Sequence, residues 1–157
     1  MKYDEFLNFI LSFGSSLFLE NENMALLKKI CSIVDKKTIH YLWSNYNSSK
    51  FVIQKKISCN QNEYHFTIEK IFTEDNYLMV IDSCCFTDND RHIILKLNRS
   101  DLIEILTCFY WELDEIYILN NDLDWFIAIN HNFEIVFYCN EDSTWLTYYR
   151  DKIMLIE

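Results

Sequence analysis

The sequence of 157 residues contains no proline and one glycine, Gly14. Loops that bind nucleotide phosphates need several glycines, because the backbone amides must approach the anion closely. The nucleophile elbow of serine hydrolases also depends on glycine at two positions. The sequence therefore excludes the usual nucleotide-binding loops and this class of hydrolase. Its fifteen asparagines are expected to form many of the turns instead.

Lysine and arginine are missing from the fifty residues 100–149, which carry ten carboxylates. Residues 1–78 hold nine basic and nine acidic residues, whereas residues 79–157 hold five basic and fifteen acidic ones, so the second half accounts for the net charge of −10. Carboxylates are seldom buried without a partner, so most of these should face water. Their summed field would attract basic partners and repel nucleic acid and anionic lipid. An acidic composition that serves solubility alone is the alternative.

Closely spaced metal ligands are also missing. The six cysteines include no C-x-x-C pair and the four histidines stand singly, so the sequence predicts no zinc site. Asn120, Asp122 and Asp124 have the spacing of the first ligands of a calcium loop. Trp125 and His131, however, occupy the positions that need glycine and glutamate. We therefore expect neither a metal nor a cofactor.

The expected location is the cytoplasm, without membrane contact. Most of the cysteines, at positions 31, 59, 84, 85, 108 and 139, lie in apolar runs, which is typical of small buried side chains in a reducing compartment. The uncharged run Phe6–Leu19 is shorter than the roughly 18 apolar residues of a membrane span. Asp4 and Glu5 precede it, where a signal peptide carries positive charge.

Length and composition favour one domain over residues 1–157. Hydrophobic residues make up 50% of the chain and aromatic residues 17%, which is enough to fill a core without disulfides. The helical spacing of apolar residues predicts helices over 3–13, 24–34 and 39–46.

The middle of the chain is richer in β-branched and aromatic residues. These predict strands over 51–58, 63–72, 76–86 and 91–97, with connections short enough for an antiparallel meander. Asp88 and Asp90 are expected to lie in a solvated turn between the last two strands.

The second half is expected to begin with a helix over 99–112, capped by Asn98 with Asp101 three residues on. Three strands follow, over 115–119, 125–130 and 134–139, and the last two are apolar on both faces, which is typical of sheltered central strands. Residues 145–149 fit a closing helix or another strand. The predicted fold class is α+β: N-terminal helices packed on a mainly antiparallel sheet, with the helix 99–112 between two strand groups.

The segment Tyr117–Tyr138 contains a strand, the turn Asp-Leu-Asp-Trp at 122–125, an apolar strand and His131 in a hairpin loop. In these features it resembles the C-terminal part of small bacterial immunity proteins from polymorphic-toxin systems. The resemblance implies a cytosolic protein that binds a cognate toxin and blocks the toxin's active site without catalysis of its own. Many such toxins are basic nucleases, and a carboxylate surface that imitates phosphate would suit them.

The surface expected to bind a basic protein partner consists of Asp114, Glu115, Asp122, Asp124, Trp125, His131, Glu141 and Asp142. For Trp125 two interpretations are open: an exposed aromatic contact within an acidic rim, or a core residue of a strand. Binding of nucleic acid is not expected, because base stacking on aromatic side chains also needs a cationic groove.

Two other classes of function stay open. The first is an enzymatic or small-ligand site near His131, because imidazole titrates near neutrality and Asp124 or Glu134 could pair with it. The second is a subunit of a larger assembly, which would expose a wide apolar patch on the isolated chain.

Overall fold

In the computed structural model of the protein, the described residues are 1–13, 17–18, 52–81, 87–88, 93–109, 115–120, 125–130 and 132–139. For residues 17–18, 52–56, 115 and 139 the description is limited to the backbone. The helices are α1 (Tyr3–Leu11), α3 (Gln61–Ile71) and α4 (Arg99–Cys108). The strands are β1 (Leu17–Phe18), β2 (Val52–Ser58), β3 (Asn76–Ile81), β4 (Ile93–Asn98), β5 (Glu115–Leu119), β6 (Trp125–Asn130) and β7 (Glu134–Cys139).

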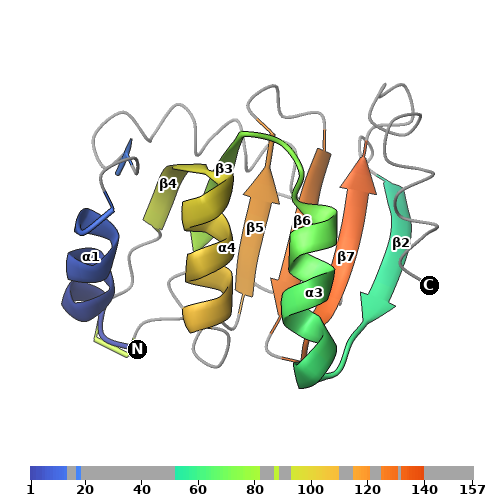
Figure 1. Ribbon diagram of the computed structural model, residues 1–157, viewed down its shortest axis with the longest axis horizontal. Coiled ribbons are helices and arrows are strands. Elements are labelled where there is room, and N and C mark those ends of the chain that lie inside the picture. The colour runs from blue at the N-terminus through green and yellow to red at the C-terminus, as the bar shows by residue number, and fades with distance from the viewer. Residues whose placement is uncertain are drawn as a thin grey trace.

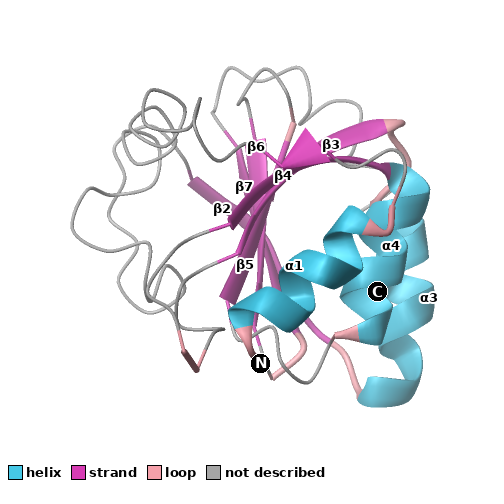
Figure 2. Cartoon of the chain, turned by 90° about the vertical axis from the view of Figure 1, so that its left-hand side faces the viewer, coloured by secondary structure: helices cyan, strands magenta, loops and turns pink. Residues whose placement is uncertain are grey.

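The strands form one seven-stranded sheet in the order β1-β4-β3-β5-β6-β7-β2, and every pairing is antiparallel (Figure 1). Figure 2 shows the three described helices on one face of this sheet. The predicted α+β class is therefore confirmed, with α1 ahead of the sheet in sequence and α4 between two groups of strands.

Most of the predicted elements are confirmed. The strands predicted over 115–119, 125–130 and 134–139 are β5, β6 and β7, with the same bounds. The strands predicted over 51–58, 76–86 and 91–97 correspond to β2, β3 and β4, and α1 and α4 correspond to the first and last of the predicted helices before residue 113. The helices predicted over 24–34 and 39–46 and the element predicted over 145–149 lie outside the described residues.

The prediction of a strand over 63–72 is wrong, because Gln61–Ile71 form the helix α3. Asn60 begins this helix: its side-chain oxygen Oδ1 accepts a hydrogen bond from the amide of Glu63 at 3.0 Å. An N-cap of this kind satisfies an amide that has no intrahelical partner in the first turn. The polar residues after β2 therefore start a helix, where the predicted meander required only a short connection between two strands.

Two periodicities are present in this segment, and the helical one decides the fold. Tyr64, Ile68 and Ile71 recur at helical spacing and are all buried. A strand would set Phe66 on one face with Tyr64 and Ile68, yet the Phe66 side chain is 65% exposed. Burying three apolar side chains on one helical face outweighs the strand alternation, which a helix does not preserve.

The predicted meander holds for β3 and β4, which pair antiparallel from Asn76–Asn98 to Ile81–Ile93. For β2 it is wrong, because β2 pairs with β7 at the far edge of the sheet. The helix α3 carries the chain across the sheet face from β2 to β3 (Figure 1). The segment 63–72, which was expected to follow β2 as a strand, is a helix, and β2 pairs with the C-terminal strand β7 instead.

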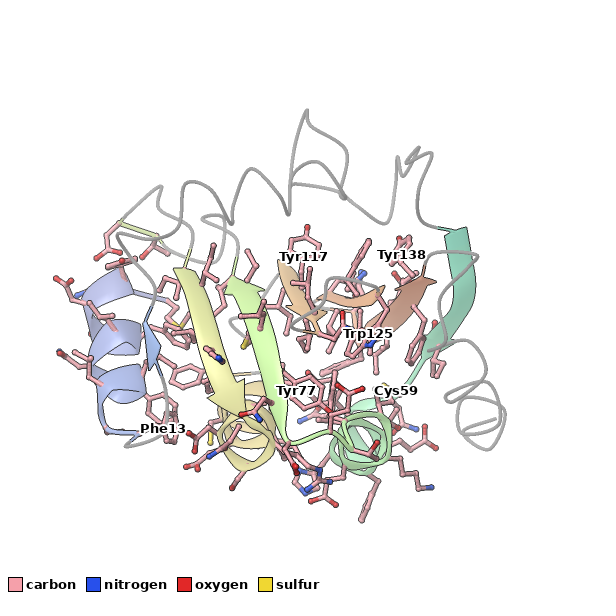
Figure 3. All side chains as sticks on the ribbon, turned by 90° about the horizontal axis from the view of Figure 1, so that it is seen from above. Phe13, Cys59, Tyr77, Tyr117, Trp125 and Tyr138 are labelled. Carbon is pink, nitrogen blue, oxygen red and sulfur yellow. The ribbon has the colours of Figure 1, made fainter. Side chains whose placement is uncertain are left out.

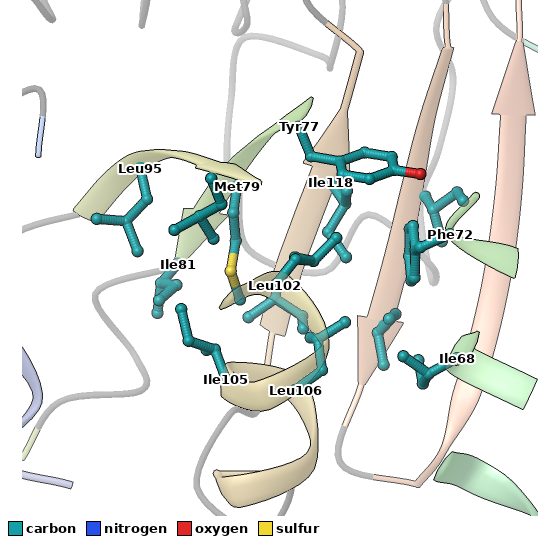
Figure 4. Packing of buried hydrophobic residues seen from close by; sticks show 14 of the residues in the cluster. Ile68, Phe72, Tyr77, Met79, Ile81, Leu95, Leu102, Ile105, Leu106 and Ile118 are labelled. Atoms are coloured by element: carbon teal, nitrogen blue, oxygen red, sulfur yellow. The ribbon is translucent and has the colours of Figure 1, made fainter. Parts of the chain in front are cut away.

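The helix-covered face of the sheet contributes to the main hydrophobic core. Met79 and Ile81 of β3 pack with Leu102 and Ile105 of α4, and Ile68 extends the same cluster from α3 (Figure 4). Strand residues two positions apart share a face, so alternate side chains of each strand reach these helices. This packing fixes the positions of α3 and α4 over the sheet.

The opposite face of the sheet is buried as well. Tyr117 and Tyr138 lie on this face, whereas Tyr77 points toward the helices (Figure 3). The rings of Phe126 and Tyr138 stack with their centroids 4.4 Å apart and an angle of 13° between planes. All six side chains of β6 are buried, which confirms that this strand is sheltered on both faces.

A residue distant in sequence caps α1. Asp88 accepts, through Oδ1, a hydrogen bond from the amide of Tyr3 at 2.8 Å, and the amide of Thr87 donates to the carbonyl of Met1 at 2.9 Å. The side chain of Lys2, at the N-cap position, makes no capping bond. Asp88 is exposed, as expected of a turn residue, but its carboxylate also satisfies an amide and complements the helix dipole.

Arg99 connects the start of α4 to the end of α3. Its Nε donates to the carbonyl of Phe72 at 2.5 Å, and its Nη2 donates to the carbonyl of Glu69 at 3.0 Å. The last carbonyls of a helix lack intrahelical partners, and a cation is favourable there. We expect Arg99→Ala to lower the free energy of unfolding, measured by urea denaturation, by about 2 kcal/mol.

The matched control is Lys70→Ala, which removes an exposed cation from the last turn of α3. It should change the free energy of unfolding by less than about 0.5 kcal/mol. Equal effects of the two variants would contradict the role assigned to the two hydrogen bonds of Arg99.

Candidate functional site

Of the eight residues predicted to bind a partner, two are described. Glu115 begins β5, where its backbone pairs with Asn130, and Trp125 begins β6. The other six lie outside the described residues: Asp114, Asp122, Asp124, His131, Glu141 and Asp142. A role of these six side chains in partner binding stays a prediction.

Trp125 belongs to the core. Its side chain is 2% exposed, and its ring meets Tyr77 edge-on with the centroids 6.2 Å apart. The amide of Trp125 donates to Oδ1 of Asn120 at 3.4 Å, which holds the residue at the start of β6. Of the two interpretations, the core one is observed, and the buried indole cannot contact a partner in this structure.

The strand order divides the predicted surface between the two ends of the sheet. The first end of the sheet is the one where β6 begins, and β5 and β7 both end there. The second end is the one where β6 ends, and β5 and β7 both begin there. Residues 121–124 connect β5 to β6, and residues 140–142 follow β7, so both segments are attached to the first end. Residues 111–114 and 131 are attached to the second end, about 14 Å away along a strand of five residues.

A strand from the first half of the chain brings lysines to the stretch 100–149. The register of β2 on β7 sets Lys55 opposite Phe137 and Lys56 opposite Val136. The backbone of Lys55 and Lys56 therefore lies beside a stretch that has no lysine or arginine of its own.

Three of the ten carboxylates in 100–149 have described side chains. Glu104 is exposed on α4, Asp101 is buried in the first turn of the same helix, and Glu134 is half-buried. The amide of Asp101 donates to Oδ1 of Asn98 at 2.8 Å, which confirms the predicted cap. Among these three, the expectation that the carboxylates face water holds for Glu104 alone.

The side chain of Asn130 organises the hairpin between β6 and β7. Its Oδ1 accepts hydrogen bonds from the amides of Asn132 at 2.9 Å and Glu134 at 3.1 Å, and its Nδ2 donates to Glu134 Oε2 at 2.8 Å. Phe133 adopts a φ of 57°, in the left-handed region. The Phe133 ring lies 5.1 Å from that of Tyr64, so the hairpin packs against α3.

Cys59 and Tyr64 lie beside this hairpin and have shifted pKa values. Burial raises the pKa of the Cys59 thiol, the charge of Glu63 raises it further, and a backbone hydrogen bond lowers it in part. Burial also raises the pKa of the Tyr64 phenol. Because the thiolate is the reactive form of cysteine, the raised pKa makes Cys59 a poor nucleophile at neutral pH.

We expect iodoacetamide at about pH 8 to modify Cys59 at least about ten times more slowly than Cys108, which is exposed on α4. The reason is that burial leaves Cys59 with less thiolate and less access to the reagent. Peptide mapping by mass spectrometry would measure both rates. Glu63→Gln should speed the modification of Cys59, whereas Glu69→Gln, on the exposed side of α3, should not; equal rates at the two cysteines would contradict this expectation.

A small pocket of about 240 Å³ lies between α3 and α4. It is lined by Gln61, Asn62, Tyr64, His65 and Thr107. The strand predicted over 63–72 concealed this site, because a strand does not place His65 on one face with Gln61 and Glu69 as the helix α3 does. The recurrence of polar side chains at every fourth position was the signal that could have found it.

No family model, no curated protein and no solved structure matches this chain. Within the described part of the chain, no helix is long and apolar enough to cross a membrane. The same residues include no group of three or more His, Cys, Asp or Glu side chains that could hold a metal ion.

Proposed function

We propose that this chain is a non-enzymatic inhibitory protein that binds a basic partner through the carboxylates of residues 100–149. The partner class that fits is a toxin, such as a basic nuclease, in the manner of the immunity proteins that the segment Tyr117–Tyr138 resembles. The observation that carries the proposal is the run of fifty residues with ten carboxylates and no lysine or arginine. A surface of this charge raises the encounter rate with a cationic protein and imitates the phosphates of a nuclease substrate.

The arrangement of β5, β6 and β7 supports this proposal. The three strands are neighbours in the sheet, and β6 is buried along its whole length. Segments attached to a buried frame lose less freedom on binding than segments of a free chain, so less of the interaction energy is lost. The segments 121–124 and 140–142 are attached to the same end of this frame, which makes that end the main contact surface of the proposal.

The experiment uses the purified product of the gene that neighbours this chain's gene. Its binding, measured by calorimetry between about 50 and 500 mM salt, should weaken steadily as salt rises, because salt screens exposed charges. Joint replacement Asp122→Lys and Asp124→Lys should weaken binding by at least about tenfold. If the product is a nuclease, an equimolar amount of the chain should also abolish its activity.

The control is the joint replacement Asp4→Lys and Glu5→Lys, which makes the same change in net charge at exposed positions on α1. It should change the affinity by less than about threefold. An affinity that does not depend on salt concentration, or that is unchanged by the charge reversal at residues 122 and 124, would contradict the electrostatic basis of the proposal.

A further inference from the structure

The pocket between α3 and α4 lies where the start of one helix meets the end of the other. Gln61 and His65 come from the first turns of α3, and Thr107 comes from the last turn of α4. At the other end of the pair, Arg99 of α4 donates to the carbonyl of Glu69 in α3, so the two helices are antiparallel. Their dipoles oppose each other at the pocket, and the side chains therefore decide which charge it favours.

The polar groups that line the pocket include three acceptor oxygens. The hydroxyl of Thr107 donates its proton to the carbonyl of Ile103 at 2.8 Å, which leaves the hydroxyl oxygen as an acceptor. Gln61 and Asn62 each add a side-chain amide, whose oxygen accepts and whose nitrogen donates. A ligand with several N–H donors can use the three oxygens, and the charge around the pocket decides between such a ligand and an anion.

Carboxylates border the pocket on both helices. Glu69 Oε1 lies 3.3 Å from Nε2 of His65, a pocket residue. Glu104 stands one turn before Thr107, so the two side chains are neighbours on the surface of α4. Both carboxylates are exposed, and together they favour a positively charged ligand over an anion.

The described cations of these two helices do not cancel this charge. Lys70 is five residues from His65, which places it about 140° around the axis of α3 from the pocket side. Arg99 is half-buried and donates to the carbonyls of Phe72 and Glu69. The pocket side of the helix pair therefore keeps a negative local charge.

The size of the pocket selects between a small molecule and a protein side chain. Its volume of about 240 Å³ lies below the roughly 300–1,000 Å³ of sites that bury a drug-sized ligand or cofactor. Beside it, the exposed ring of Phe66 lies 6.0 Å from the ring of His65, centroid to centroid. One exposed aromatic residue is ordinary on its own, but next to a pocket it adds the apolar contact that interfaces with cationic side chains use.

We propose that the pocket between α3 and α4 binds an arginine side chain of a protein partner. A guanidinium offers five N–H donors in one plane and stacks on aromatic rings, which suits the acceptors, the bordering carboxylates and Phe66 together. The inference rests on the proposed function only in that the partner is a protein. It adds a contact surface on the helices to the one proposed at the strand ends.

The first test is an NMR titration of the full chain with acetyl-Gly-Arg-Gly-amide. Saturable shifts are expected at the amides of residues 61–66 and 105–108, with a dissociation constant in the millimolar range, as fits one side chain. The peptide with citrulline in place of arginine, which is neutral, should bind at least about fivefold more weakly. No saturable shift up to about 50 mM peptide, or equal affinity for the two peptides, would overturn the proposal.

A pair of matched variants separates the pocket from general charge. Joint replacement Glu69→Gln and Glu104→Gln should weaken binding of the arginine peptide by about fivefold, whereas Asp4→Asn with Glu5→Gln on α1 should weaken it by less than about twofold. Equal weakening by the two pairs would mean that net charge alone attracts the peptide, and would overturn the proposed site.

The last test uses the product of the neighbouring gene. Phe66→Ala should weaken its binding by at least about tenfold, and Leu11→Ala, at a residue that is 66% exposed on α1, by less than about threefold. Equal effects would remove this surface from the interface and overturn the inference. Binding of the arginine peptide without binding of the gene product would instead support the pocket and refute the proposed partner.

Discussion

Replacing Ile68 by alanine should lower the free energy of unfolding by about 3 kcal/mol. Ile68 is fully buried on the core face of α3, where it extends the cluster formed by β3 and α4 (Figure 4). The loss combines the transfer of the removed carbon atoms to water with the cavity that they leave. The higher helix propensity of alanine offsets only about 0.4 kcal/mol of it. Urea denaturation followed by circular dichroism would measure the change.

The matched control is Phe66→Ala on the same helix. Phe66 is the larger side chain, but because it is exposed we expect a change within about 0.5 kcal/mol. In a strand, residues 66 and 68 would share a face and both replacements would be costly, whereas in a helix they lie about 200° apart. Similar losses in the two variants would therefore contradict the helix α3.

Replacing Phe126 by alanine should lower the free energy of unfolding by about 4 kcal/mol. Phe126 belongs to β6, an interior strand of the sheet, and lies on the face opposite the helices. It is fully buried, and its ring stacks on that of Tyr138 with the centroids 4.4 Å apart. Its loss removes both the buried area of the ring and the aromatic contact. The same urea titration would measure the change in the free energy of unfolding. The slope of that free energy against urea concentration would show whether unfolding stays two-state.

The control for this second variant is Phe126→Leu, which keeps most of the apolar volume. It should cost about 1 kcal/mol, because the cavity is smaller and the site stays apolar. If Phe126→Ala also cost less than about 1 kcal/mol, the face of the sheet opposite the helices could not be as dry as its buried side chains indicate.

The C-terminal strands were predicted from the sequence with their correct bounds, because the signals for them are local. Each strand is mainly an apolar run bounded by polar residues, and the runs of β6 and β7 are apolar on both faces, which predicts strands sheltered on both sides. The cap at Asn98 was also local, since an N-cap and the amide that it binds lie three residues apart. Such features need no knowledge of distant contacts.

The error at 63–72 arose where two local patterns compete. Tyr64, Phe66 and Ile68 alternate as in a strand, while Tyr64, Ile68 and Ile71 recur as in a helix, and the two readings share two residues. The Asn60 cap favours the helix by satisfying an amide at its start. The helix then covers part of the sheet face, in front of β6 and β7 (Figure 1). The second cause is tertiary, so the local patterns alone did not decide between a strand and a helix.

The sequence by itself determined the excess of carboxylates in the second half of the chain, the existence of the strands β5 to β7 and the start of α4. These follow from side-chain chemistry and from patterns within a few residues. Only the tertiary structure decided that Trp125 is buried, that Asp88 caps α1, and that Lys55 and Lys56 lie beside β7. Those facts depend on which distant segments pair, and pairing is settled by the shared burial of side chains from all the strands and helices, a sum that no local pattern contains.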